Sequence, residues 1–205
     1  MHERDFTFYC DQLVVGSRNC RSQWRWVNEG GRSYIRLEKK QHVQDTFLHL
    51  QKRTEGGTMI DFSEKEIEKD PACAAIEDTG RILSFEYHIL YNESYEVPSL
   101  LFNIYEEGGG KFNIEEAWHF LRISEVVPLN EMYQAITMVH HPILFRPYLN
   151  LHPCKASEMM NSLPDSMNPI LSFLTSYGPF VNLEQDELVF SLHSSVYLKQ
   201  HTNMK

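Results

Sequence analysis

Cys154 is the residue of this sequence whose surroundings are best suited to chemistry. Pro153 fixes the backbone directly before it, and a short helix is expected to begin near Ala156. A thiol near the N-terminus of a helix experiences the positive end of the helix dipole, which favours the thiolate. Lys155 and His152 would add to the positive field around the sulfur. A thiolate in a loop fixed by proline can accept an acyl group and hold it as a thioester.

The local pattern leaves other interpretations of Cys154 open. A free cysteine is often a small buried hydrophobe, and His-Pro-Cys is only a three-residue motif. A cysteine hydrolase would use a nearby histidine, such as His140, His141 or His152, as the base for the thiol. A zinc site is not favoured, because these histidines fit neither a C-x-x-C nor an H-E-x-x-H pattern and adjacent strand residues point to opposite faces.

The bulk composition limits the class of protein and its partners. A chain of 205 residues can bury one sizeable core, so we expect a single domain over residues 1–192 and a frayed tail over residues 193–205. A net charge of −9 opposes a polyanion, so nucleic acid is excluded as the main partner. No apolar run is long enough to cross a bilayer and no basic amphipathic stretch stands out, so stable membrane insertion is not expected.

The cysteines and the N-terminus together predict a cytoplasmic protein. The chain begins with charged residues where a secretory signal would turn apolar. No two cysteines form a C-x-x-C pair, and without a secretory context reduced thiols are the simpler expectation. The four cysteines are Cys10, Cys20, Cys73 and Cys154.

The elements that must position Cys154 are predicted to begin with a short amphipathic helix, because apolar residues from Phe6 to Val14 recur at helical spacing. Trp24 and Trp26 then indicate a strand, which a Gly30-Gly31 turn joins to a second strand over residues 34–40. A third strand is expected over residues 47–51. The acidic stretch over residues 54–80 is interpreted as a mobile loop.

The clearest hairpin of the sequence spans Ile82 to Tyr105. Its first strand alternates apolar and polar residues, so one face is expected to join the core. The other face is expected to be solvated or partly packed and available to a partner. The core face comprises Leu83, Phe85, Tyr87, Ile89 and Tyr91, and the other face comprises Ser84, Glu86 and His88.

Helices are predicted to dominate the remainder of the chain, which makes the fold α+β. Asn113 has Glu116 three residues later, a variant of the capping box at the start of a helix. Two more helices are expected over residues 156–161 and 169–176. The apolar patch over residues 188–190 is interpreted as a strand.

Several segments form a specific set through their order and spacing. They are Glu86–Tyr91, Ser94–Pro98 with Leu101-Phe102, His141–Leu144 with Pro147, and Leu151–Lys155, followed by Glu158-Met159, Leu174–Ser176, Gly178-Pro179 and Val181. Together they resemble the autophagy-related protein ten family of ubiquitin-like-conjugating enzymes, over nearly the whole chain apart from the acidic stretch and the tail. The resemblance implies a reduced ubiquitin-conjugating-enzyme-like fold, an antiparallel sheet flanked by helices, with Cys154 as the thioester residue.

The resemblance also implies the partners. Members of that family receive autophagy-related protein twelve from the activating enzyme autophagy-related protein seven and transfer it to a lysine of autophagy-related protein five. The chemistry requires a thiolate, a deprotonated lysine and donors for a tetrahedral oxyanion, and no metal or organic cofactor.

The oxyanion donor is left open by the sequence. Ordinary ubiquitin-conjugating enzymes have a His-Pro-Asn motif before their cysteine, whereas Ile143 follows His141-Pro142 here. Asn150, His141 and Tyr95 are the candidates, and each also has a packing or surface interpretation.

Other protein classes provide the remaining alternatives. The sibling autophagy-related protein three family shares the His-Pro-Cys element but modifies a lipid, and it typically has a long acidic insertion and a membrane-sensing start. This chain is shorter and its first helix is brief, which favours protein conjugation. A cysteine hydrolase of modifier conjugates and a non-catalytic binding module of the same fold stay open.

Overall fold

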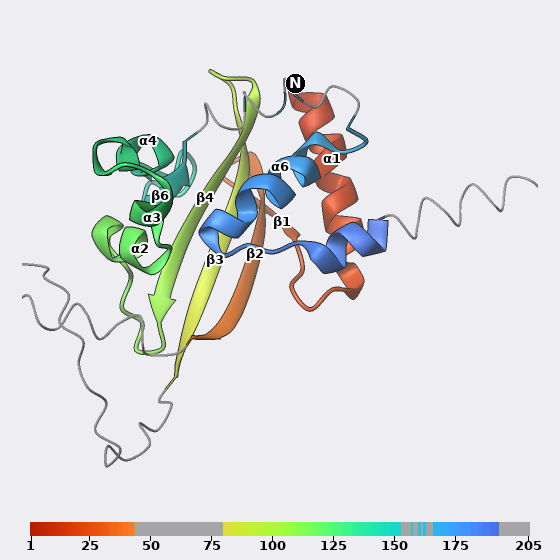
Figure 1. Cartoon of the computed structure of the whole chain (residues 1–205). Coiled ribbons are helices and arrows are strands. Elements are labelled where there is room, and N and C mark those ends of the chain that lie inside the picture. Colours follow the sequence, from red (N-terminus) through yellow and green to blue (C-terminus); the bar gives the residue numbers. More distant parts are fainter. Residues whose placement is uncertain (44–79, 153–156, 158–159, 161, 163–165, 193–205) are drawn as a thin grey trace, which may run out of the picture.

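The computed structural model describes residues 1–43, 80–152, 157, 160, 162 and 166–192 (Figure 1). Its centre is a six-stranded sheet with strand order β1-β2-β3-β4-β6-β5, in which every neighbouring pair is antiparallel. The predicted α+β class, with an antiparallel sheet flanked by helices, is therefore confirmed. The strands are β1 (Arg25–Glu29), β2 (Arg32–Val43), β3 (Arg81–Asn92), β4 (Val97–Glu106), β5 (Ile136–His140) and β6 (Pro147–Leu151).

Two helices, α1 (Glu3–Gly16) and α6 (Pro169–Tyr177), contribute to the core on one face of this sheet (Figure 1). The opening helix was predicted correctly, and its buried residues Phe6, Cys10 and Leu13 recur at helical spacing. The predicted helix over residues 169–176 is also confirmed. Asn168 caps it by accepting a hydrogen bond from the Leu171 backbone N–H.

Three of the shorter helices, α2, α3 and α4, lie close to β6 in Figure 1, and α2 and α4 contact β5. The predicted capping box of α2 is present, because Asn113 accepts from the Glu116 backbone N–H and Glu116 accepts from the Asn113 backbone N–H. None of the helices in the described ranges has both the length and the apolar character that crossing a bilayer demands. The short elements are α2 (Ile114–Phe120), α3 (Ile123–Val126), α4 (Met132–Ala135), η1 (Ser17–Asn19), η4 (Leu129–Glu131) and η5 (Gly178–Val181).

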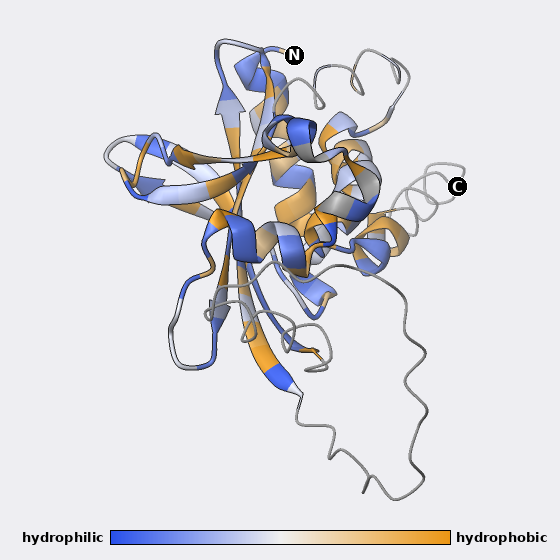
Figure 2. Cartoon of the chain, turned by 60° about the vertical axis from the view of Figure 1, so that its left-hand side comes forward, coloured by the Kyte–Doolittle hydropathy of each residue, from blue (hydrophilic) through white to orange (hydrophobic). Residues whose placement is uncertain are grey.

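In the central hairpin, β3 places its predicted apolar face in the main core, whereas β4 is buried at eight successive positions. The hydroxyl of Tyr87 donates to the carbonyl of Val181 at 2.8 Å, which links this face to the C-terminal segment. Hydrophobic positions are concentrated on the inner helices and strands in Figure 2, while turns are mostly hydrophilic. The buried residues of this face are Leu83, Phe85, Tyr87, Ile89, Leu100, Phe102 and Ile104.

The prediction for the opposite face was wrong at His88, which is completely buried. Residues distant in the sequence cover it: the rings of Tyr34, His141 and Tyr148 lie 4.5, 5.1 and 5.0 Å from its own ring. These side chains come from β2, the β5–β6 turn and β6. The alternation of residues in β3 does not indicate that these distant side chains bury His88.

The predicted strand over residues 188–190 was also wrong, because residues 186–192 are helical. A short apolar run does not distinguish a strand from a buried helix, and Leu188 is buried in the core here. Predictions for residues 47–51, 54–79 and 193–205 lie outside the described residues, as does Cys154. Of the predicted helix over residues 156–161, only Ser157 and Met160 are described, and both are helical.

Candidate active site

The end of β6 leads the chain toward the candidate nucleophile. His152 is the last described residue before Cys154, which lies outside the described residues. The backbone N–H of His152 donates to the carbonyl of Ala135 at 3.1 Å, and Ala135 directly precedes β5. This hydrogen bond extends the β5–β6 pairing by one position at the open end of the hairpin, from which the chain continues to Cys154.

Tyr95 lies in the β3–β4 turn, at the end of the sheet toward which β6 runs. The antiparallel register pairs Leu101 with Asn150, so later residues of β6 approach the start of β4. In the turn, Asn92 Oδ1 accepts from the backbone N–H groups of Ser94 and Tyr95, both at 3.1 Å. The Tyr95 side chain is 50% exposed, so the turn presents it to solvent.

Asn150 faces the same side of the sheet as His88, because Leu101 pairs with both residues. It is only 6% exposed, and its Oδ1 atom is buried without a hydrogen-bond partner in the described structure. Buried polar atoms are nearly always paired, because an unpaired one loses its hydration without compensation. The Asn150 amide oxygen is therefore an unsatisfied acceptor close to the end of β6.

His141 organises the turn between β5 and β6 and is completely buried. Its Nδ1 atom accepts from the backbone N–H groups of Ile143 and Leu144, both at 3.1 Å. Its backbone carbonyl accepts from Phe145, and its backbone N–H donates to Arg146. Phe145 has φ +53°, a strained conformation for a bulky residue, which the surrounding hydrogen bonds hold in place.

A chain of polar contacts continues from His141 across the sheet. His141 Nε2 lies 3.0 Å from His88 Nδ1, and His88 Nε2 lies 3.0 Å from Glu86 Oε1. The Tyr105 hydroxyl donates to Glu86 Oε2 at 3.1 Å, and Arg36 Nε lies 3.2 Å from Glu86 Oε1. We name these five residues, Arg36, Glu86, His88, Tyr105 and His141, the histidine relay.

The pKa shifts within the relay favour an ionised Glu86 carboxylate and a neutral His141 imidazole. Burial alone would raise the pKa of the Glu86 carboxyl, but the hydrogen bond from His88, the charge of Arg36 and the Tyr105 hydroxyl together lower it to about 2. Burial lowers the pKa of His141 to about 4, because an imidazolium would lose its hydration there. His141 is therefore neutral and Glu86 is ionised near neutral pH.

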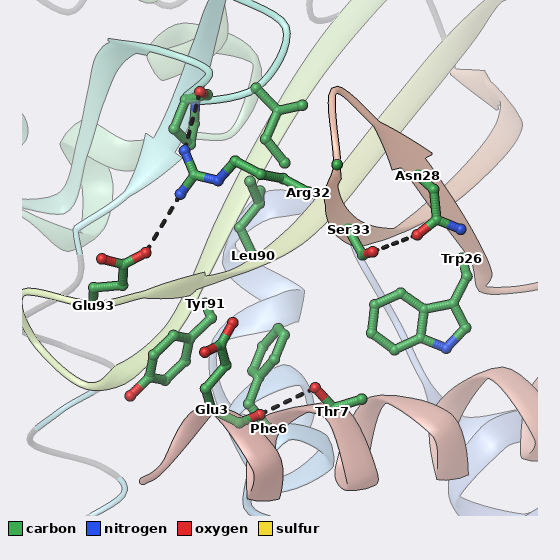
Figure 3. A pocket seen from close by; sticks show the side chains of 13 residues that line it. Glu3, Phe6, Thr7, Trp26, Asn28, Arg32, Ser33, Leu90, Tyr91 and Glu93 are labelled. Atoms are coloured by element: carbon green, nitrogen blue, oxygen red, sulfur yellow. Dashed lines mark hydrogen bonds and ion pairs between the residues drawn. The ribbon is translucent and has the colours of Figure 1, made fainter.

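A pocket of about 330 Å³ lies between α1, the β1–β2 turn, the end of β3 and the β5–β6 turn (Figure 3). The Arg32 guanidinium bridges two of these parts, since it lies 3.5 Å from the Glu93 carboxylate and 3.5 Å from the Pro142 carbonyl. The carboxylate of Glu3 and the indole of Trp26 also line the pocket. No cysteine lines the pocket, and its two hydroxyl side chains, Thr7 and Ser33, donate to the Glu3 carbonyl and to Asn28 Oδ1.

The two described cysteines do not have the character of activated thiols. Cys10 is fully buried in the core, and burial raises the pKa of its thiol far above the usual value. Burial and then the neighbouring Glu187 raise the pKa of Cys20. Among the described side chains, no group of three or more His, Cys, Asp or Glu residues could hold a metal ion.

The structure places the three candidate oxyanion donors at different positions. Asn150 lies level with His88 across Leu101 of β4, Tyr95 lies beyond the start of β4 in the β3–β4 turn, and both ring nitrogens of His141 are engaged inside the protein. Sequence reasoning missed Glu86 and His88 as parts of this region. Their only signal is a glutamate and a histidine two positions apart on one strand face, which is common on solvated strands.

Comparison with known proteins agrees with this architecture. Residues 5–187, a range that contains Cys154, match the family described as autophagocytosis associated protein, active-site domain. The chain is 29% identical over 197 residues to the ubiquitin-like-conjugating enzyme ATG10 of Homo sapiens, covering 88% of each protein. It is 26% identical over 176 residues to ATG10 of Arabidopsis thaliana, covering 75% of this chain and 76% of the relative.

A third relative extends the comparison to another lineage. The chain is 31% identical over 123 residues to the ubiquitin-like-conjugating enzyme ATG10 of Dictyostelium discoideum, covering 50% of this chain and 52% of the relative. The family match spans most of the described fold, from α1 to the helical residues after α6. The chain therefore belongs to the autophagocytosis-associated protein active-site domain family, among the ubiquitin-like-conjugating transferases of autophagy.

Proposed function

We propose that the chain carries the ubiquitin-like modifier autophagy-related protein twelve as a thioester on Cys154. The activating enzyme autophagy-related protein seven would supply the modifier, and a lysine of autophagy-related protein five would receive it. The observation that carries this proposal is the family match over residues 5–187, which includes the His-Pro-Cys segment after β6. The raised thiol pKa values of Cys10 and Cys20 argue against those cysteines as the nucleophile.

The reaction would proceed in two steps at Cys154. The thiolate first attacks the thioester of the activating enzyme, which leaves as a thiolate, so the modifier changes cysteine without oxidation or reduction. A deprotonated lysine amine then attacks the Cys154 thioester, and the resulting oxyanion requires nearby donors. The nitrogen releases one proton to solvent and the Cys154 thiolate leaves, which forms the amide bond. Asn150 is the favoured donor because its side-chain amide, whose NH2 group can donate, is buried near the end of β6, the strand that precedes Cys154.

Tyr95 is assigned to substrate positioning in this proposal. Its exposed side chain and its place at the end of the sheet toward which β6 runs support contact with the lysine-bearing protein. Holding two proteins in register is expected to supply much of the rate of such a transfer. A hydrolase would have to use His140 or His152 as its base, since both ring nitrogens of His141 are already engaged.

The test is a charging assay with the activating enzyme, the modifier and ATP. The wild type should form an adduct that a thiol reductant removes, and Cys154→Ala should form none. Cys154→Ser should form a longer-lived oxyester, because an ester resists aminolysis better than a thioester does. An adduct of unchanged yield in Cys154→Ala would refute the assignment, whereas loss of Cys10 or Cys20 should leave charging intact.

A further inference from the structure

The β5–β6 hairpin is joined to the rest of the sheet by a short backbone ladder. β3 and β4 share ten paired positions, whereas β4 and β6 share only two, Leu101 with Asn150 and Phe102 with Leu149. Two pairs constrain the angle between the hairpin and the sheet only weakly. Side-chain contacts must therefore help to fix the strand that leads to His152.

The histidine relay provides such a contact, and its protons can be placed from the geometry. His141 Nδ1 faces two backbone N–H donors, from Ile143 and Leu144, so this nitrogen must carry a lone pair. A neutral His141 then has its proton on Nε2, which donates to His88 Nδ1. His88 in turn has its proton on Nε2, which donates to the Glu86 carboxylate.

The hydrogen bonds of the relay can be donated in only one direction, from His141 to His88 and from His88 to Glu86, because the groups at both ends are fixed. At one end the backbone amides of the β5–β6 turn require an acceptor, and at the other end the ionised Glu86 requires donors. Arg36 and Tyr105 hold that carboxylate in place from β2 and β4. Reversing the tautomer of either histidine would set two N–H groups against each other.

We propose that Glu86 and His88 are positioning residues for the transfer reaction, which hold His141 in the Nε2-protonated tautomer and thereby fix the turn that leads into β6. Neither residue is assigned contact with the reacting atoms. Their effect passes through the His141 turn to β6, the strand that directly precedes His152. The kinetic part of this proposal depends on the proposed function, and the tautomer of His141 does not.

Loss of His88 Nδ1 as the acceptor for His141 should destabilise the β5–β6 turn. His141 would then be able to move its proton to Nδ1, where the two backbone N–H groups of the turn would lose their acceptor. The strained φ angle of Phe145 would favour a different turn conformation once these hydrogen bonds are lost. The start of β6 would shift relative to β3, since the ladder to β4 is short.

A matched pair of substitutions separates this role from general packing. In His88→Asn the amide oxygen can take the place of Nδ1 and accept from His141, while the contact with Glu86 is lost. In His88→Gln the amide nitrogen can take the place of Nε2 and donate to Glu86, while the acceptor for His141 is lost. Both variants remove an imidazole from the same buried position, so a packing role predicts similar behaviour.

The measurements are the ¹⁵N chemical shifts of the His141 ring and the single-turnover discharge of loaded Cys154 to a small amine at saturating concentration. We expect wild type and His88→Asn to have the proton of His141 on Nε2 and discharge rates within about twofold of each other. His88→Gln should move the proton to Nδ1 and discharge about 10- to 100-fold more slowly, the effect of a small misplacement of reacting groups. The amine concentration that gives half of the maximal discharge rate should be the same for His88→Gln as for the wild type.

Two results would overturn the proposal. One is a wild-type His141 with its proton on Nδ1, which can be measured without any activity assay and does not depend on whether a variant folds. The other is equal discharge by His88→Asn and His88→Gln at equal thermal stability. A wild type that forms no thioester would instead refute the proposed function, while the ¹⁵N measurement would still decide the direction of the relay.

Discussion

His88 Nδ1 lies 3.0 Å from His141 Nε2, although 53 positions separate the two residues in the sequence. Both side chains are completely buried, and the rings of Tyr34 and Tyr148 enclose them. The contact joins the centre of β3 to the turn before β6. A polar pair at such a position has to be fully satisfied, because an unpaired buried nitrogen would cost about 1–3 kcal/mol. The Glu86 carboxylate and the turn amides meet that requirement.

The stability of the protein should fall on mild acidification because of His141. Its pKa is about 4 in the folded protein, whereas an ordinary histidine in the unfolded chain has a pKa of about 6.5. Between these values the unfolded state binds more protons, so the free energy of unfolding decreases as pH falls, by up to ~1.4 kcal/mol per pH unit. Urea unfolding between about pH 7 and about pH 5 measures this slope.

His141→Asn is the control for this pH dependence. The variant should be less stable at neutral pH, but its free energy of unfolding should change less over the same pH interval. The depressed pKa of Glu86 contributes only at lower pH, where the carboxyl of the unfolded chain begins to bind protons. A slope that is the same in wild type and variant would contradict the assignment to His141.

The helix cap at Asn113 should contribute to stability and not to charging. Asn113→Ala removes the acceptor for the Glu116 backbone N–H, and the loss of an N-cap costs about 1 kcal/mol. Asn113→Ser keeps a capping oxygen and should retain most of that stability. Thermal or urea unfolding measures the difference, and a destabilisation of Asn113→Ser as large as that of Asn113→Ala would argue against the cap.

Elements with a local signal were predictable from the sequence. The capping box around Asn113 depends on two residues three positions apart, and the β3–β4 hairpin on alternation within one segment. The opening helix likewise shows its buried stripe within fourteen residues. Each of these elements is specified by neighbours in the chain, so the pattern alone carried the information.

The burial of His88 and the helix at residues 186–192 depend on contacts that no local pattern records. His88 is polar and alternates with apolar residues, as a solvated strand residue would, yet Tyr34 and Tyr148 from distant strands cover it. Trp24 donates through its indole to Gln185 at 2.9 Å, which fixes the start of the C-terminal segment from 161 positions away. Tertiary contacts of this kind decide burial, and in short apolar runs they decide between helix and strand.

Tyr95→Ala should slow discharge to the protein substrate without destabilising the fold. The side chain is half exposed and the turn is held by the Asn92 side chain, so the free energy of unfolding should change by less than about 0.5 kcal/mol. Loading of Cys154 and discharge to a small amine should remain near normal, because neither needs the lysine-bearing protein. A parallel loss of stability and of both transfer steps would identify Tyr95 as structural instead.

Asn150→Leu should separate stability from activity. The Oδ1 atom of Asn150 is buried and unpaired in the described structure, so an apolar side chain of similar shape should leave the free energy of unfolding unchanged or raise it. If the Asn150 amide donates to the oxyanion, discharge of the Cys154 thioester should fall about 100-fold or more. Discharge to a small amine and urea unfolding, measured on the same preparation, test both parts.

Asn103→Leu is the matched control for Asn150→Leu. Asn103 is also buried with an unpaired Oδ1, but it lies two positions beyond Leu101 on β4, on the side away from the end of β6. The Asn103 amide nitrogen donates to Tyr105 at 3.3 Å, so this control loses one long hydrogen bond and should be the less stable of the two variants. Its discharge rate should nevertheless stay within a few-fold of wild type, because the amide is not near the chain that leads to Cys154. Equal losses of discharge in both variants would show that either substitution disturbs the sheet, and Asn150 would then be a packing residue.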